Sequence, residues 1–225
     1  MESGEPRVAV GPFYALSIAA GCVDAISFVG FHQVFTANMT GNMVLLGIAV
    51  VSLFSALPIT IGFVYPLVAI VAFIAGAVAP LPLFPAGLHA RRAATVVLAE
   101  GVLVAIAAIA FALLRAPFVV PLCIALVSFA MGAQSMVASK AGLPGISTTY
   151  VTGTLITALT RGLSHGATDE HRRDAVRNIW VIVAYIGGAS LGALLFLAFN
   201  RNVLILPTLA FAAIAVWLDR RAFHS

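Results

Sequence analysis

Long apolar runs constrain the fold of this chain more than any other feature. A helix needs about 17–20 apolar residues to cross the hydrocarbon core of a bilayer. Six runs reach that length, at residues 9–31, 58–81, 94–114, 117–138, 178–199 and 203–219. Hydrophobic residues make up 62% of the 225 residues and charged residues only 9%, so a water-soluble fold could not bury the apolar surface. The sequence predicts an all-α polytopic membrane protein.

Two shorter apolar runs, residues 41–57 and 153–164, each begin at a Thr-Gly step. The first step, Thr40-Gly41-Asn42, recurs 112 positions later as Thr152-Gly153-Thr154. At the same offset the residues 71–77 (VAFIAGA) match 183–189 (VAYIGGA), and at offset 111 the residues 21–24 (GCVD) match 132–135 (GAQS). We therefore predict two tandem repeats, 1–115 and 116–225, within a single membrane domain, 1–225. Each repeat has three long transmembrane helices and one short helix headed by Thr-Gly.

The basic residues predict how the short helices sit in the membrane. If all eight segments cross, the twelve Lys and Arg residues divide eight to four between the two sides. If the Thr-Gly segments dip in and return, the division is ten to two, with only Arg115 and Arg201 on the poorer side. The positive-inside rule favours the re-entrant arrangement, although short tilted crossings remain an alternative. The charged stretch 165–177 is expected to be a cytoplasmic loop or surface helix.

Three crossings per repeat would invert one repeat relative to the other, as in many secondary transporters. The inverted arrangement is therefore favoured over a parallel one. The same rule places both termini on the cytoplasmic side of an inner (cytoplasmic) membrane. The expected partners are the lipid bilayer and a small-molecule solute. No binding to nucleic acid is expected, and the formation of a homo-oligomer is left open.

The Thr-Gly steps also predict a polar site. A helix that begins inside the membrane exposes unpaired N–H groups and a partial positive charge at its first turn, and lipid cannot satisfy them. Asn38 and Thr40 suit an N-cap, and Gly41 permits close backbone approach. Thr152 and Gly153 would do the same in the second repeat. Two such starts converging from opposite sides would suit an anion, a carboxylate or a neutral polar solute. The alternative is a pair of ordinary helix caps near the membrane surface.

Two acids lie within the apolar runs. An intramembrane acid costs roughly 2.5–3.5 kcal/mol on insertion scales and is a functional-site hypothesis by default. Asp24 could accept a proton, bind a cation or pair with Asn38 or Asn42; the alternative to a functional role is a structural polar contact between helices. Its counterpart in the second repeat is Ser135, so only one repeat carries the acid. Glu100 could share the proton-coupling role. Its alternative is structural: the side chain would snorkel to the interface or pair with Arg91 and Arg92.

Several of these motifs together resemble a known family. The run GCVDAISF, its spacing to VFTANMTGN, and the later GAQS and TTYVTGT resemble the YoaK-type family of bacterial membrane proteins over essentially the whole chain. That family is catalogued as a domain of unknown function and is usually presumed to contain small-molecule permeases. The positions that match its motifs are Gly21, Asp24, Asn38, Thr40, Gly41, Asn42, Gln134, Thr152 and Gly153.

These observations lead to a permease for a small polar or anionic solute, coupled to protons, with its site near the midplane between the repeats. The residues expected to bind substrate are Asp24, Asn38, Thr40, Gly41, Asn42, Gln134, Ser135, Thr152, Gly153 and Thr154. Asp24 and Glu100 are expected to carry the coupling proton. The alternatives are a passive channel of aquaporin-like geometry and a non-transporting scaffold or assembly subunit. We expect no enzymatic activity, no cofactor and no metal.

Overall fold

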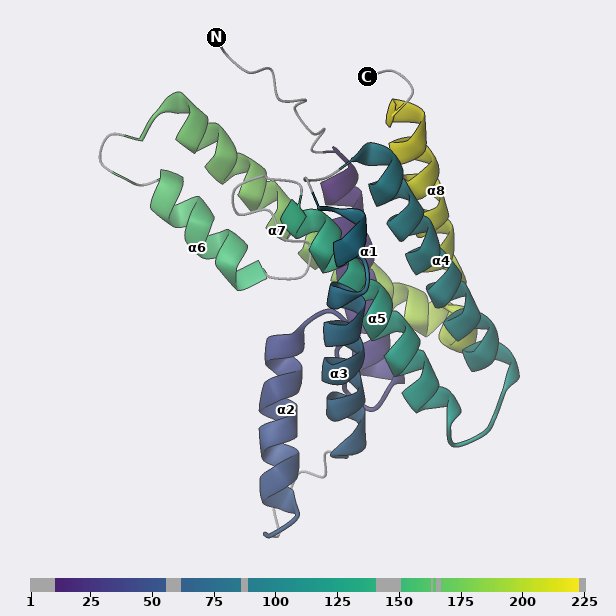
Figure 1. The fold of residues 1–225 in the computed structure, drawn as a ribbon. Helices are drawn as coiled ribbons and strands as arrows, with labels where there is room; N and C mark the ends of the chain where they lie inside the picture. Colours follow the sequence, from purple (N-terminus) through teal and green to yellow (C-terminus); the bar gives the residue numbers. More distant parts are fainter. Residues whose placement is uncertain are drawn as a thin grey trace.

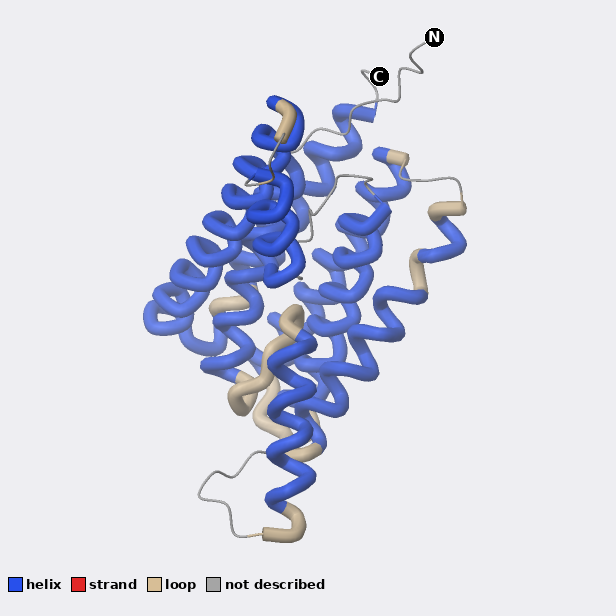
Figure 2. Tube along the Cα trace, turned by 90° about the vertical axis from the view of Figure 1, so that its left-hand side faces the viewer, coloured by secondary structure: helices blue, strands red, loops and turns tan. Residues whose placement is uncertain are grey.

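The computed structural model describes residues 11–55, 62–85, 89–140, 151–162, 164 and 167–222, and the regular structure in these ranges is entirely helical (Figures 1 and 2). The α-helices are α1 (Gly11–Gly30), α2 (Met39–Ser52), α3 (Val64–Val78), α4 (Ala90–Leu113), α5 (Val119–Lys140), α6 (Val151–Gly162), α7 (Asp169–Phe199) and α8 (Ile205–Ala222). Two short 3-10 helices, η1 (Leu81–Leu83) and η2 (Asn200–Asn202), follow α3 and α7.

Five helices are long and apolar enough to cross a membrane. These spans cover Gly11–Gly30, Val64–Leu83, Arg91–Leu113, Val119–Lys140 and Asp169–Asn202. Helix α8 covers the sixth expected run, but its last turn carries Asp219, Arg220 and Arg221, which shortens its apolar part. Large apolar side chains are exposed along these helices, as lipid contact requires. The prediction of a polytopic α-helical membrane protein is confirmed.

Helix α7 begins earlier than its apolar run. It starts at Asp169 and therefore includes most of the charged stretch 165–177, which forms its first turns. Thr168 caps this start by accepting a hydrogen bond from the His171 amide at 3.2 Å. A helix of 31 residues is about 46 Å long at 1.5 Å per residue, longer than the roughly 30 Å hydrocarbon core. The charged turns can therefore lie outside the core while the rest of α7 crosses it.

Glycines allow two pairs of helices to touch along their backbones. Gly21 of α1 lies against the backbone of Tyr185 and Ala189 in α7, while Gly188 and Gly192 of α7 lie against the backbone of α1. Gly132 of α5 lies in the same way against the backbone of α3, and Gly76 of α3 against that of α5. A methyl group at any of these positions would overlap a main-chain oxygen of the partner helix. Small residues at such crossings are typical of helix packing in membranes.

The short helices α2 and α6 occupy one side of the bundle. Helix α2 packs on α3, and α6 packs on α7. Both begin near the middle of the molecule's height and run toward opposite ends (Figure 1). The view from that side shows the same arrangement, with one short helix above the other (Figure 2).

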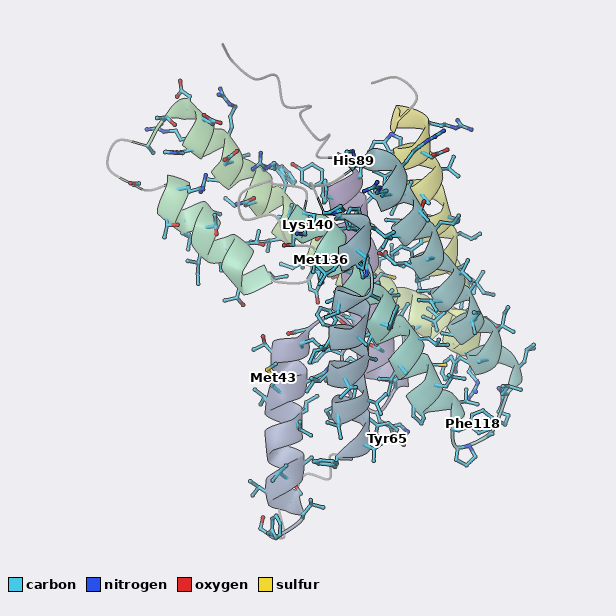
Figure 3. The ribbon with its side chains drawn as sticks, viewed as in Figure 1. Met43, Tyr65, His89, Phe118, Met136 and Lys140 are labelled. Carbon is cyan, nitrogen blue, oxygen red and sulfur yellow. The ribbon has the colours of Figure 1, made fainter. Side chains whose placement is uncertain are left out.

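The two ends of the bundle differ in charge. Figure 3 places His89 and Lys140 near one end, and Tyr65 and Phe118 near the other. At the second end Arg201, which follows α7, caps the end of α4: its Nε donates to the Phe111 carbonyl and its Nη2 to the Leu114 carbonyl, both at 2.7 Å. The basic residues of α4, α5, α7 and α8 lie at or near the first end, where α4 and α7 begin and α5 and α8 finish.

Candidate functional site at the start of α2

Asp24 is the centre of the polar contacts around α2. It lies on α1 with 2% of its surface exposed. Its Oδ1 accepts hydrogen bonds from the backbone amides of Thr36 at 2.8 Å and Ala37 at 2.6 Å. Its Oδ2 accepts a hydrogen bond from the Tyr185 hydroxyl of α7 at 2.5 Å. One carboxylate therefore joins α1, the chain before α2, and α7.

The chain turns back along α1 before α2 begins. We call residues 31–38 the return segment. His32 and Gln33 adopt positive φ angles of 56° and 61°, which reverse the chain after α1. Since Asp24 lies six residues before the last residue of α1, its bonds to Thr36 and Ala37 draw the return segment about 9 Å back along that helix. Helix α2 therefore starts part-way along the bundle and not at its end (Figure 1).

Side chains of α2 itself fix its first turn. Asn38 is the N-cap, and its Oδ1 accepts a hydrogen bond from the Gly41 amide at 3.2 Å. Asn42 is fully buried and bonds both sides of the Phe35 peptide: its Oδ1 accepts from the Phe35 amide at 3.0 Å and its Nδ2 donates to the Phe35 carbonyl at 2.6 Å. A Cβ on Gly41 would lie 2.8 Å from the Phe35 ring. The residues of the first Thr-Gly motif therefore contact one another and Phe35.

The structure brings Asp24, Asn38, Gly41 and Asn42 together through the return segment. Thr40 lies in the same first turn with its side chain exposed. In the first turn of α2, the Asn42 side chain is therefore buried and hydrogen-bonded to Phe35, whereas the Thr40 hydroxyl is exposed. Such a turn has free N–H groups and a partial positive charge directed outward, which attract anions and polar groups.

The second repeat contributes the remaining predicted residues from two places. Thr152 and Gly153 lie in the first turn of α6, with Thr152 exposed, and Thr154 is buried at 1% exposure. Gln134 and Ser135 lie on α5. The Gln134 Nε2 donates to the Leu16 carbonyl of α1 at 3.2 Å, and the Ser135 hydroxyl donates to the Met131 carbonyl at 3.0 Å. Gln134 therefore links α5 to α1 about two turns from Asp24.

Glu100 is placed differently from Asp24. It lies on α4 with 1% of its surface exposed, and neither carboxyl oxygen has a hydrogen-bond partner among the residues that the structure describes. The expectation that Glu100 snorkels to the interface is wrong, because the side chain turns into the core. Arg92 instead donates from Nη1 to the Leu83 carbonyl at 2.7 Å.

The comparisons with known proteins agree with the motifs. Residues 13–217 match the family described as "Protein of unknown function (DUF1275)". The chain belongs to this family. It is also 34% identical over 201 residues to the "UPF0700 transmembrane protein YoaK" of Bacillus subtilis (strain 168), a match that covers 85% of this chain and 86% of the relative. The resemblance to the YoaK-type family is thus confirmed. No solved structure gives a significant match.

One important residue of this YoaK-type site was not predicted. Tyr185 donates to Asp24 but was not among the predicted site residues. A signal was present in the sequence: at the offset of 112 Tyr185 corresponds to Phe73, and at the offset of 111 Asp24 corresponds to Ser135. The acid and its hydroxyl donor are therefore both replaced at the matching positions. A search for matching positions that differ in polarity would have indicated the pair.

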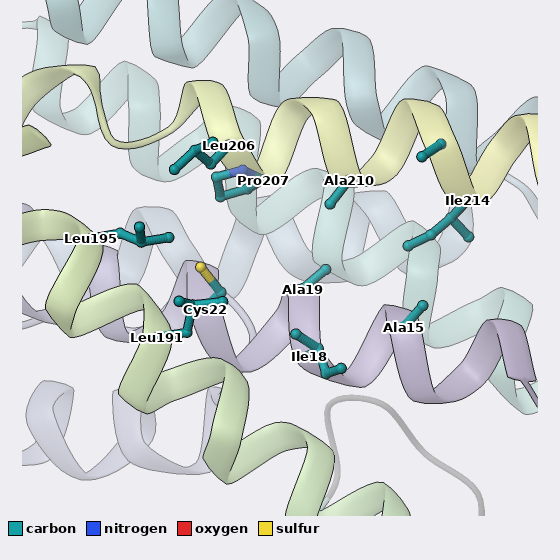
Figure 4. Close-up of a pocket in the computed structure, with 11 residues that line it drawn as sticks. Ala15, Ile18, Ala19, Cys22, Leu191, Leu195, Leu206, Pro207, Ala210 and Ile214 are labelled. Carbon is teal, nitrogen blue, oxygen red and sulfur yellow. The ribbon is translucent and has the colours of Figure 1, made fainter.

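A separate apolar cavity of about 330 Å³ lies between α1, α7 and α8 (Figure 4). Its wall includes Ile18, Cys22, Leu191, Leu206 and Ile214, and it is almost free of polar atoms. Such a lining suits hydrocarbon and offers a polar solute nothing to bind. In this family member, the polar groups at the starts of α2 and α6 are therefore better candidates for a solute site than this cavity.

Proposed function

We propose that this protein is a permease for a small polar or anionic solute, bound between the starts of α2 and α6. The observation that carries the proposal is the return segment. Asp24 and Asn42 hold it against α1 so that α2 starts part-way along the bundle. A helix that starts at this depth of a membrane needs a ligand or water, because lipid cannot satisfy its N–H groups. Interrupted helices of this kind form the substrate sites of many secondary transporters.

The proposal includes two inverted repeats, α1–α4 and α5–α8. Two glycine crossings support it. Gly188 lies against Ile18 and Gly76 against Phe129. Gly188 corresponds to Gly76 at the sequence offset of 112, and Phe129 corresponds to Ile18 at the offset of 111. The helix pairs α1–α7 and α3–α5, and likewise α2–α3 and α6–α7, correspond under the same exchange.

The charge distribution supports the orientation that we propose. Arg115 and Arg201 lie together at one end, and the remaining basic side chains of the described helices lie toward the other. The positive-inside rule would place the richer end in the cytoplasm. Helix α1 begins and α8 ends there, which would put both termini on the cytoplasmic side of a bacterial inner membrane (Figure 1).

The groups available at the site favour solute binding over bond-breaking chemistry. Thr40, Thr152 and the N–H groups of two helix starts can donate hydrogen bonds to a carboxylate or to a neutral polar solute. Asn38, Gly41, Asn42, Gly153, Thr154, Gln134 and Ser135 would shape the surrounding wall. The two membrane acids, Asp24 and Glu100, are the groups that could couple transport to protons. We accordingly propose transport and not enzymatic activity.

Reconstitution tests the proposal directly. Purified protein in proteoliposomes would be given a panel of small carboxylates and neutral polyols, with and without a proton gradient. We expect saturable uptake of at least one solute, lost in the double variant Thr40→Val/Thr152→Val. Thr160→Val is the matched control, because Thr160 is exposed on α6 about two and a half turns from that start and its hydroxyl already donates to the Ile156 carbonyl at 2.9 Å.

Other outcomes would favour one of the alternative functions over a permease. Flux that never saturates and needs no gradient would indicate a passive channel. If no solute in the panel moves and a fixed partner protein co-purifies, the chain is a scaffold or assembly subunit. Equal loss of uptake in the Thr160→Val control would show that the site does not lie at the helix starts.

A further inference from the structure

The two membrane acids differ completely in their hydrogen bonding. Asp24 receives three donors: two backbone amides and the Tyr185 hydroxyl. A carboxylate with three donors is well stabilised as an anion. It also cannot change its charge without weakening contacts that hold the return segment. Asp24 is therefore suited to a fixed, structural charge. Glu100 has no donor to either oxygen.

Contacts on both sides of Glu100 place it between α4 and α5. Residues 93, 96, 100, 104 and 107 follow the helical spacing of one face of α4. At one end of this face, Ala93 and Val96 pack with Ala133 and Val137 of α5. At the other end, the Ala107 carbonyl accepts a hydrogen bond from the Cys123 thiol of α5 at 3.4 Å.

The intervening part of α5 is apolar. It includes Val127 and Ala130, which are fully buried. The Glu100 carboxyl group is consequently surrounded by core side chains at the middle of this helix pair.

Few ionisable groups lie near Glu100. On α5 the titratable groups are Cys123, whose thiol donates to Ala107, and Lys140 in the last turn, ten residues beyond Ala130 and about 15 Å farther along the helix. Gln134 is neutral and donates to Leu16. On α8 the residues beside Gly101 are Phe211 and Ala212. Asp219 and Arg220 are exposed and lie seven to nine residues farther along α8, about 10–13 Å away. Glu100 thus has neither a counter-ion nor a second oxygen-rich group near it among the described residues.

These surroundings decide which ion Glu100 can bind. An unpaired anion in this position would carry a large desolvation cost with nothing to offset it. A metal cation needs several oxygen ligands, and no group of three or more candidate ligands occurs among the described residues. A proton needs only one carboxyl oxygen, and it removes the charge.

We propose that Glu100 is the proton-carrying residue of this protein and that Asp24 is a positioning residue. The inference rests on the proposed permease function and names its coupling ion and carrier. A proton from water on one side forms an O–H bond with a Glu100 oxygen. The same bond breaks when the α4–α5 interface opens to the other side, and the proton returns to water there. No other bond changes.

Infrared spectroscopy tests this assignment without any knowledge of the solute. Protein in nanodiscs is titrated over a broad pH range, and the C=O stretching band of protonated carboxylic acids is followed. We expect one such band to persist above the range of exposed carboxyl groups. It should be lost in Glu100→Gln, shifted in Glu100→Asp, and retained in Asp24→Asn. The Glu100→Asp variant keeps a carboxyl group at the position and guards against misfolding of Glu100→Gln.

Two results would overturn the assignment: the absence of a persistent band in the unmodified protein, or a band that survives in Glu100→Gln. In proteoliposomes, Glu100→Gln should lose proton-gradient dependence while solute exchange without a gradient continues. If no solute moves at all, the permease proposal fails, but the infrared result still decides whether Glu100 holds a proton.

Discussion

At the scale of single residues, buried polar side chains hold this protein's irregular backbone in place. Asp24, Asn42 and Asn38 each bond to main-chain groups of residues 35–41. These main-chain groups lack helical partners, and in a membrane they would otherwise remain unsatisfied at a cost of several kcal/mol each. Asn38 and Asn42 of the first Thr-Gly motif therefore have a structural role, whereas the exposed Thr40 beside them is available to bind a ligand.

The link between Asp24 and Tyr185 can be tested by removing one hydroxyl. Tyr185→Phe should lower the free energy of unfolding by about 1.5–3 kcal/mol, the value of a hydrogen bond to a charged group. Phe fits because the first repeat carries Phe73 at the corresponding position. Thermal unfolding in detergent measures the effect. Tyr65→Phe, which keeps the ring that stacks on His32, is the control and should change little. Equal effects of the two variants would contradict a specific Asp24–Tyr185 bond.

Asn42 should not tolerate an isosteric acid. Asn42→Asp loses the donor to the Phe35 carbonyl and brings a second acceptor against it. The expected loss is at least about 1–3 kcal/mol, the penalty of a buried group left without its partner. Asn38→Ser is the matched control, because serine caps helices about as well as asparagine. Thermal stability of the two variants gives the comparison, and an unchanged midpoint for Asn42→Asp would argue against the Phe35 contact.

At the scale of helices, the apolar runs predicted most elements correctly because lipid imposes both length and composition. For residues 165–177 the sequence left a loop and a surface helix as alternatives; Asp169 to Arg177 are helical and continue α7 beyond its apolar run. The candidate site was predicted from the Thr-Gly motif, but its inward turn at His32 and Gln33 was not. That turn depends on Asp24 and Tyr185, which are far apart in sequence, and no local pattern encodes such a contact. The burial of Glu100 likewise depends on which face of α4 meets α5.

The helix crossings provide a matched pair of variants on adjacent residues of α7. Gly188→Ala would place a methyl group against the Ile18 backbone, and we expect it to cost about 1–3 kcal/mol through overpacking. At Gly187 a Cβ would meet no atom within 4 Å. Gly187→Ala should therefore stabilise the helix by about 0.5–1 kcal/mol. Thermal unfolding of both variants in nanodiscs is the measurement. Similar midpoints would show that α1 and α7 do not cross at Gly188.

At the scale of the whole molecule, three observations support the topology that we propose. The return segment brings the start of α2 back along α1, α2 and α6 run toward opposite ends, and the basic side chains gather at one end. A solute that enters from either side would meet one of the two helix starts. The central claim is that α2 and α6 enter the membrane from opposite faces and return to the face from which they came.

Side-specific labelling of single cysteines measures this claim most directly. Cys22 and Cys123 are buried and should not react with a membrane-impermeant reagent. His32→Cys and Ser55→Cys flank the first short helix, and Ser139→Cys and Ser164→Cys flank the second; all four positions are exposed. The account predicts that the first pair is labelled only from outside intact cells and the second pair only after the cytoplasmic side is opened. Labelling of His32→Cys and Ser55→Cys from opposite sides would contradict it.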